Sequence, residues 1–181
     1  MKSHMLLLSA HARSGNVARC EEVMAQLHKS GLRPDTFALN AMINAYGRAG
    51  RLDDMERVLS DMLDSVSCKP DVWTMNIILS LFGNRGEVEL MERWYEKFRG
   101  YGVEPETRTL NILIGAYGKR RMYDKMSAVM EHMRKLAFPW TTATYNNVIE
   151  AFAEAGDAGN MEHAFNQMRS EGMRPDTKTF C

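Results

Sequence analysis

Four asparagines recur at a nearly constant spacing and are the residues best suited to specific hydrogen-bond chemistry. They are Asn40, Asn76, Asn111 and Asn146, separated by 36, 35 and 35 residues. A carboxamide carries both a donor and an acceptor, so it can pair with the polar edge of a nucleobase. Each asparagine lies between apolar residues, and a polar side chain kept four times in such surroundings indicates a repeated role.

The prolines show the period of the elements that must position these amides. All five of them, Pro34, Pro70, Pro105, Pro139 and Pro175, are separated by 34 to 36 residues. A period of this length indicates stacked helical repeats. The repeats span 1–35, 36–71, 72–106, 107–141 and 142–176, and 177–181 begins a sixth that is cut short. We therefore expect an all-α fold, a right-handed α-solenoid of about five helix-turn-helix repeats of about 35 residues.

Apolar residues at positions 4, 7, 8 and 11 of each repeat predict an amphipathic first helix. Glycine follows that helix at position 15 in four repeats and is suited to end it in a left-handed conformation. The fourth repeat has Arg121 there, so we expect its turn to be looser or differently built. At position 12 the residue is glycine or alanine, which indicates a close approach between helices. The opening residues, Met1 to Met5, look partly like an expression scar.

The second helix of each repeat carries apolar residues at positions 20, 24 and 27, and many of the fifteen methionines occupy these places. Methionine can line an adaptable binding groove, but this spacing favours core packing. The acidic or hydroxyl residue at the end of a repeat is suited to cap the next first helix.

Composition and motifs exclude several classes of function. Lysine and arginine balance aspartate and glutamate at 23 each, so no overall basic charge points to nucleic acid. Cys20, Cys68 and Cys181 lack metal-ligand spacing, and the five histidines are scattered. Phosphate-binding, dinucleotide-binding and nucleophile-elbow motifs are absent. We expect no enzyme, no cofactor and no metal site, and the sequence has no apolar run of about 18 residues that would span a membrane.

The repeat resembles the pentatricopeptide repeat. Thr144-Tyr145-Asn146 near the start and Gly172-Met173-Arg174-Pro175-Asp176 at the end are close to the consensus of that family. The tetratricopeptide pattern, with Trp, Gly and two Ala at fixed positions, does not fit. Unbroken runs near 35 residues resemble the P subclass of plant organelles, and the chain looks like part of a longer array.

This resemblance implies sequence-selective binding of single-stranded RNA at one base per repeat, for organellar RNA processing, stabilisation, splicing or translation. Asn with Asp favours uracil in the family, so the array is expected to lean towards pyrimidines. The resemblance implies base reading by Asn40 with Asp71, Asn76 with Glu106, Asn111 with Thr141 and Asn146 with Asp176, base clamping by Phe37, Trp73, Arg108 and Ala143, and phosphate contacts by Arg13, Arg48 and Lys119. It places the protein in the chloroplast, with the mitochondrion as the alternative.

Other interpretations of the same residues stay open at this stage. The asparagines could cap helices, although an Asp or Thr one turn earlier is already suited to that role. Phe37 and Trp73 could pack between repeats instead of stacking on bases. The whole array could be a protein-binding scaffold, which the zero net charge favours, or its uncapped ends could self-associate.

Overall fold

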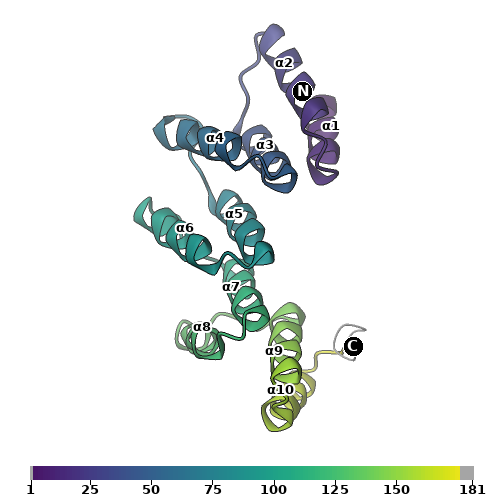
Figure 1. Ribbon diagram of the computed structural model, residues 1–181, viewed down its shortest axis with the longest axis vertical. Helices are drawn as coiled ribbons and strands as arrows, with labels where there is room; N and C mark the ends of the chain where they lie inside the picture. The colour runs from purple at the N-terminus through teal and green to yellow at the C-terminus, as the bar shows by residue number, and fades with distance from the viewer. Residues whose placement is uncertain (1, 176–181) are drawn as a thin grey trace. The chain divides into compact units, whose positions relative to one another are not determined.

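The computed structural model describes residues 2–175, with side chains from His4 onward, and this part of the chain is helical and contains no strand (Figure 1). The all-α expectation is confirmed. Its helices are α1 (Lys2–Arg13), α2 (Val17–Lys29), α3 (Thr36–Ala49), α4 (Leu52–Asp64), α5 (Val72–Arg85), α6 (Val88–Gly100), α7 (Thr107–Lys119), α8 (Tyr123–Lys135), α9 (Thr142–Ala155) and α10 (Ala158–Ser170). Each repeat expected from the sequence therefore holds two helices of similar length.

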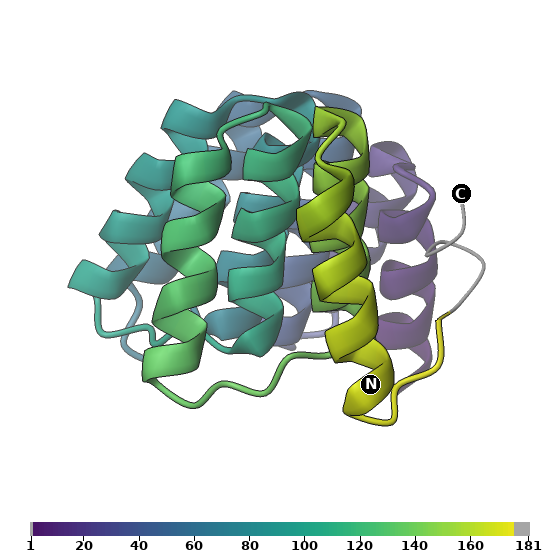
Figure 2. The ribbon, with the colours of Figure 1, turned by 90° about the horizontal axis from the view of Figure 1, so that it is seen from below.

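The helices group into two compact units, and the division falls within α5. Unit 1 comprises Met1–Leu81 with Gly100–Val103, and unit 2 comprises Phe82–Arg99 with Glu104–Cys181. In unit 1, α1 packs against α2 and α3, and α3 against α4. In unit 2, α7 packs against α8 and α9, and α9 against α10, so that α8 lies beside α7 and α10 lies beside α9 (Figure 2).

The residue before each first helix sets where that helix begins. The Asp35 side chain accepts the Ala38 N–H at 2.9 Å, and the Thr141 side chain accepts the Thr144 N–H at 3.4 Å. These bonds satisfy backbone donors that a helix start leaves open. The predicted caps are thus present, and the start of the first helix is fixed relative to the asparagine at position 5.

The turn between the two helices has the same geometry with and without glycine. Gly50 ends α3 at φ 77°, donating to the Gly47 carbonyl at 3.2 Å, and the next N–H reaches Tyr46. Arg121 takes φ 57° and donates to Gly118 at 2.9 Å in the same pattern. The expectation of a looser or differently built turn in the fourth repeat is wrong. Packing of the flanking helices imposes the left-handed conformation on a residue that does not favour it.

The methionine positions of the second helices form the core, as the spacing predicts. Met55, Leu59 and Met62 of α4 are fully buried, and Met126, Met130 and Met133 of α8 are also buried. The first helices approach one another at position 12. A Cβ built on Gly118 would lie 2.9 Å from the Cβ of Ala151, closer than side chains tolerate. The close approach expected at this position is confirmed.

A buried tyrosine joins successive repeats in each unit. Tyr46 donates from its hydroxyl to Glu21 at 3.1 Å in unit 1, and Tyr117 donates to Glu92 at 2.8 Å in unit 2. A cation completes both groups, because Arg51 lies 3.0 Å from Glu21 and Lys125 lies 2.6 Å from Glu92. Burial alone would raise the Glu92 pKa, but the hydrogen bonds from Lys125 and Tyr117 outweigh it and hold that pKa below its usual value.

The fourth repeat lacks glycine at a second left-handed position, which gives a test of this backbone argument. Ala137 has φ 54°, where the other described chain turns of this kind use Gly31, Gly102 and Gly172. Because an alanine in this region carries strain, we expect Ala137→Gly to raise the free energy of unfolding by about 1 kcal/mol. Urea unfolding followed by circular dichroism measures it. The control, Ala128→Gly in the exposed middle of α8, should lower stability by about 1 kcal/mol; equal losses in both variants would contradict the argument.

No described helix is both long and apolar enough to cross a bilayer. Of the cysteines, Cys20 is buried and Cys68 partly buried, both as free thiols, and Cys181 lies outside the described residues.

Candidate functional site

In unit 1 the structure brings the position-5 amide of one repeat onto the first residues of the next. Asn40 Nδ2 of α3 donates to Asp71 Oδ1 over a long 3.4 Å contact. The same carboxylate oxygen accepts the Thr74 N–H at 2.9 Å, so Asp71 caps α5 while it contacts the asparagine. Asn40 is only 3% exposed, whereas Asp71 is exposed. The two residues form a polar group whose carboxylate faces solvent and whose amide lies beneath it.

Unit 2 repeats this arrangement with a hydroxyl in place of the carboxylate. Asn111 Nδ2 of α7 donates to Thr141 Oγ1 at 3.2 Å, and Thr141 caps α9. Asn111 is partly exposed and Thr141 is exposed, so a ligand reaches this amide more readily than it reaches Asn40. A second asparagine, Asn147 of α9, donates to the backbone carbonyl of Asn111 at 3.1 Å and ties the two helices together beside the site.

These contacts remove the capping interpretation of the two asparagines. The caps of α3 and α9 are Asp35 and Thr141, and the cap of α7 is Glu106, whereas Asn40 and Asn111 lie inside their helices. Their amides point between repeats, towards the start of the next first helix. Interior asparagines disfavour a helix, so a role outside helix formation is required to account for them.

The other two expected pairs are placed as follows. Asn76 is buried in unit 1, and Glu106 is exposed at the start of α7 in unit 2. Asn146 is partly exposed on α9, and its expected partner Asp176 lies outside the described residues.

The sequence analysis missed two threonines that complete the site. Thr74 Oγ1 donates to Asn40 Oδ1 at 2.7 Å, and Thr144 Oγ1 donates to Asn111 Oδ1 at 2.6 Å. Both threonines are fully buried at position 3 of their repeats. The sequence held a signal for them, since threonine recurs at position 3. The asparagine that each threonine contacts lies in the preceding repeat, so the pairing is not visible within one repeat.

The expected base-clamping residues occupy the first turns of their helices. Phe37 is 48% exposed and Trp73 is 51% exposed, which is unusual for large aromatic side chains and leaves much of each ring accessible. Packing therefore leaves about half of each of these two residues exposed. Arg108 and Ala143, at the equivalent positions of α7 and α9, are also exposed.

The three expected phosphate ligands have different surroundings. Arg13 and Arg48 are exposed in unit 1, and Arg48 is held by hydrogen bonds to the Arg13 carbonyl at 3.0 Å and to Asn44 at 3.3 Å. Lys119 is exposed at the end of α7 in unit 2. Arg48 is thus prepositioned by two hydrogen bonds.

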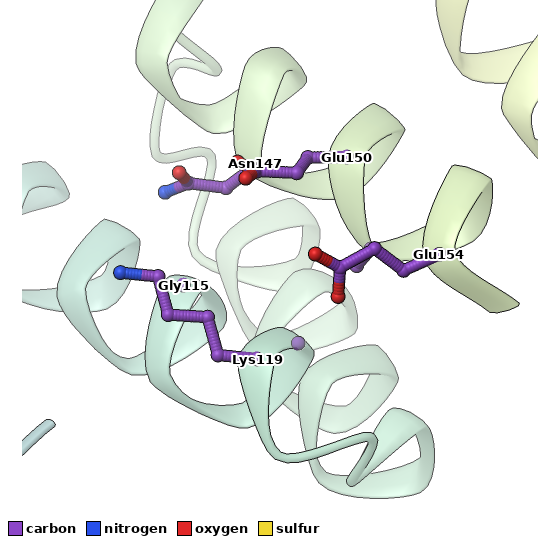
Figure 3. Close-up of a pocket in the computed structure, with 7 residues that line it drawn as sticks. Gly115, Lys119, Asn147, Glu150 and Glu154 are labelled. Carbon is purple, nitrogen blue, oxygen red and sulfur yellow. The ribbon is translucent and has the colours of Figure 1, made fainter. Parts of the chain in front are cut away.

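Lys119 borders a small cavity of about 20 Å³ between α7 and α9, room for about one water molecule. Glu150 and Glu154 of α9 line the same cavity, together with Asn147 and Gly115 (Figure 3). Among the described residues, no group of three or more acidic, histidine or cysteine side chains is arranged to hold a metal ion. Two glutamates thus lie near the one cation expected to contact phosphate in this unit, which the sequence analysis did not anticipate.

Models of known repeat families match nearly the whole chain. A model of the PPR repeat family matches residues 34–84, a pentatricopeptide repeat domain model matches 3–49, and a PPR repeat model matches 73–103. A model described as pentatricopeptide repeat-containing protein matches 107–180.

Curated relatives are plant proteins of the same kind. A chloroplastic pentatricopeptide repeat-containing protein of Arabidopsis thaliana is 61% identical over 102 residues, which is 56% of this chain and 21% of that protein. A second from the same plant is 47% identical over 86 residues, 48% of this chain and 17% of the relative. The chain spans about a fifth of the length of these relatives, or less. Both are named chloroplastic, which bears out the chloroplast prediction.

Solved structures share the fold. The pentatricopeptide repeat protein PPR10 in complex with an 18-nucleotide psaJ RNA element superposes with a TM-score of 0.82 at 23% identity, over 93% of this chain and 25% of that one. The repeat domain of Arabidopsis thaliana protein-only RNase P 1, in complex with tRNA, superposes with a TM-score of 0.69 at 13% identity. The match covers 96% of this chain and 91% of that one. With the repeat models covering nearly its full length, the chain belongs to the pentatricopeptide repeat family.

Proposed function

We propose that this protein binds single-stranded RNA in chloroplast RNA metabolism and reads it at one base per repeat, with a preference for pyrimidines and for uracil in particular. The observation that carries the proposal is the repeated pair of a position-5 asparagine and an oxygen-bearing residue at the start of the next repeat. The RNA-bound relatives of this fold support the class of ligand. Processing, stabilisation, splicing and translation are the steps in which such binding acts.

The pair suits the edge of a pyrimidine. In unit 2, Asn111 Nδ2 donates one hydrogen to Thr141 and keeps a second for a base carbonyl. The exposed oxygen of Thr141, or of Asp71 in unit 1, can accept a base N–H. Uracil offers a carbonyl beside an N–H, which matches a donor beside an acceptor. Base edges carry sequence information that contacts to phosphate lack.

The exposed rings and the cations supply the contacts that do not depend on sequence. Stacking on Phe37 or Trp73 is worth about 1–3 kcal/mol per base. Three phosphate contacts, by Arg13, Arg48 and Lys119, predict a slope of log K against log salt of about −2 for a single strand. Such a shallow slope means that base contacts and stacking carry much of the affinity.

Fluorescence anisotropy with labelled oligo-U, oligo-C, oligo-A and oligo-G tests the proposal. We expect tighter binding of the pyrimidine oligomers, and a loss of about tenfold in oligo-U affinity for Asn111→Ala, equal to about 1.4 kcal/mol. Asn40→Ala should lose less, because that amide is nearly buried.

The matched control is Asn166→Ala, which makes the same change at an exposed position of α10 and should leave binding unaltered. Equal losses in Asn111→Ala and Asn166→Ala would show that the position-5 amide has no special role.

A protein-binding scaffold is the second candidate, favoured by Glu150 and Glu154 beside Lys119. Absence of binding to every oligomer at high protein and low salt would support it. Self-association is a third possibility, which Leu6 and Leu7 of α1 favour because they are 72% and 51% exposed. Light scattering should then report a size that rises with protein concentration.

A further inference from the structure

The shortest hydrogen bond of the Asn40 and Asn111 amides is with a residue outside the expected reading pair. Thr74 Oγ1 lies 2.7 Å from Asn40 Oδ1, and Thr144 Oγ1 lies 2.6 Å from Asn111 Oδ1. The contacts from Nδ2 of these asparagines to the last residue of the repeat are 3.4 and 3.2 Å. Two separate units thus use the same short hydroxyl–amide bond.

The backbone fixes the direction of each hydroxyl. The Asp71 N–H donates to Thr74 Oγ1 at 3.1 Å, and the Thr141 N–H donates to Thr144 Oγ1 at 3.0 Å. A hydroxyl has one hydrogen to donate, and its shortest contact in both units is to the asparagine oxygen. Because both threonines are fully buried, water does not compete for that hydrogen.

The carboxylate of Asp71 confirms this orientation of the amide in unit 1. A carboxylate accepts and cannot donate, so the side of Asn40 that faces it must be Nδ2. The opposite side, Oδ1, then faces the Thr74 hydroxyl. Rotating the amide by 180° would place two oxygens against each other at Asp71 and would bring N–H groups against the hydroxyl hydrogen.

We propose that Thr74 and Thr144 are positioning residues that lock the amides of Asn40 and Asn111 with Nδ2 free to donate, so that each site selects a base offering an acceptor. The inference rests on the proposed RNA-reading function and adds the specificity determinant for it. With Oδ1 occupied, a base that presents an amino group to the amide leaves two donors face to face. A base that presents a carbonyl oxygen at that point completes the pair.

The sequence follows the same rule in the remaining repeats. Position 3 is threonine after each repeat with asparagine at position 5, and it is Ala38 after the first repeat, where position 5 is Met5. The pairs by sequence are Asn40 with Thr74, Asn76 with Thr109, Asn111 with Thr144 and Asn146 with Thr179.

Valine removes the hydroxyl at nearly the same size, and serine restores it. We expect Thr74→Val/Thr144→Val to reduce the ratio of oligo-U to oligo-A affinity at least about fivefold, which is about 1 kcal/mol. The loss should come mainly through Asn111, whose released amide presents either edge, because Asp71 still faces Nδ2 of Asn40. Thr74→Ser/Thr144→Ser should retain the ratio of the unaltered protein. The single variants are measured as well, so that a folding failure of the double valine variant leaves the comparison intact.

A capping control separates positioning from stability. Asp35→Ala removes the cap of α3 and should therefore lower the melting temperature. It should not alter the ratio of oligo-U to oligo-A affinity, because the repeat before α3 has methionine, not asparagine, at position 5. In ¹⁵N spectra the Asn111 side-chain amide should exchange hydrogen faster in Thr144→Val than in Asp35→Ala.

The outcomes distinguish the two proposals. Selective binding by the unaltered protein with the same selectivity in the valine variants would overturn the positioning role and leave the RNA-reading function standing. Absence of selectivity in the unaltered protein would overturn base reading itself, and the positioning inference with it. A loss of selectivity in the valine variants that serine does not repair would also overturn the role of the hydroxyl.

Discussion

Gly118→Val is expected to lower the free energy of unfolding by about 2–3 kcal/mol, the cost of overpacking a tightly filled contact. Gly118 lies on α7 where this helix packs against α9. A Cβ there would lie 2.9 Å from the Cβ of Ala151 and 3.6 Å from Sδ of Met126. The Ala151 atoms belong to a helix and cannot move aside as the end of a flexible side chain can. Urea unfolding followed by circular dichroism gives the change.

The control for this variant is Gly159→Val on α10, where the nearest atom to a built Cβ is Asp157 Oδ1 at 3.8 Å. Valine is a better helix former than glycine, so this change should leave the free energy of unfolding unaltered or raise it by about 0.3 kcal/mol. In a double-mutant cycle, Ala151→Gly should recover most of the loss caused by Gly118→Ala, with a coupling energy of about 1 kcal/mol. Additive effects of the two changes would show that the helices are not in limiting contact there.

The period of the chain was sufficient to predict its helices because each repeat carries the same few local signals. Proline ends the second helix, an oxygen-bearing residue caps the next first helix, and the apolar spacing sets the buried face. These signals act within a few residues, so one sequence shows them. The methionines of α4 and α8 are buried for the same reason.

The left-handed turns of the fourth repeat show where local preference is overruled. Arg121 and Ala137 adopt the positive φ that other repeats assign to glycine. The conformational preference of arginine or alanine for negative φ predicts a different turn, because that preference considers each residue without its neighbours. The neighbouring helices, held by Tyr117 and the packed methionines, determine the path of the chain and impose the strain.

The site was predicted in part. The spacing selected Asn40 and Asn111, and the structure places each beside the residue expected as its partner. It also shows that Asn40 is nearly buried and that Thr74 contacts it most closely. Accessibility and the direction of a hydroxyl depend on how one repeat packs on the next, which spacing along a sequence does not specify.

Glu150→Lys/Glu154→Lys is expected to raise affinity for oligo-U about thirtyfold at low salt, about 2 kcal/mol. Both glutamates lie on α9 at the cavity that Lys119 borders, and both are exposed (Figure 3). A phosphate drawn to Lys119 would lie within a Debye length, about 8–10 Å, of the carboxylates that line the same cavity from α9. Replacing them with lysines removes repulsion and adds cations that release counterions from the strand.

The salt dependence identifies the mechanism, because affinity alone could rise through many surface changes. Two added phosphate contacts should steepen the slope of log K against log salt by about 1.4 for a single strand. The double variant should therefore gain most at low salt and lose much of its advantage at high salt.

Glu162→Lys, an exposed change on α10, reverses charge on the second helix of the same repeat and serves as the control. If binding depended only on net charge, Glu162→Lys would give about half the gain in binding free energy that the double variant gives at the same salt concentration. It makes half the change in charge. If phosphate follows the first helices, Glu162→Lys should leave both affinity and salt slope nearly unchanged. A gain without selectivity for pyrimidines in the double variant would mean that added charge dominates base contacts. Retained selectivity together with the steeper slope would mean that Lys119 and its neighbours hold the strand while the asparagines read it.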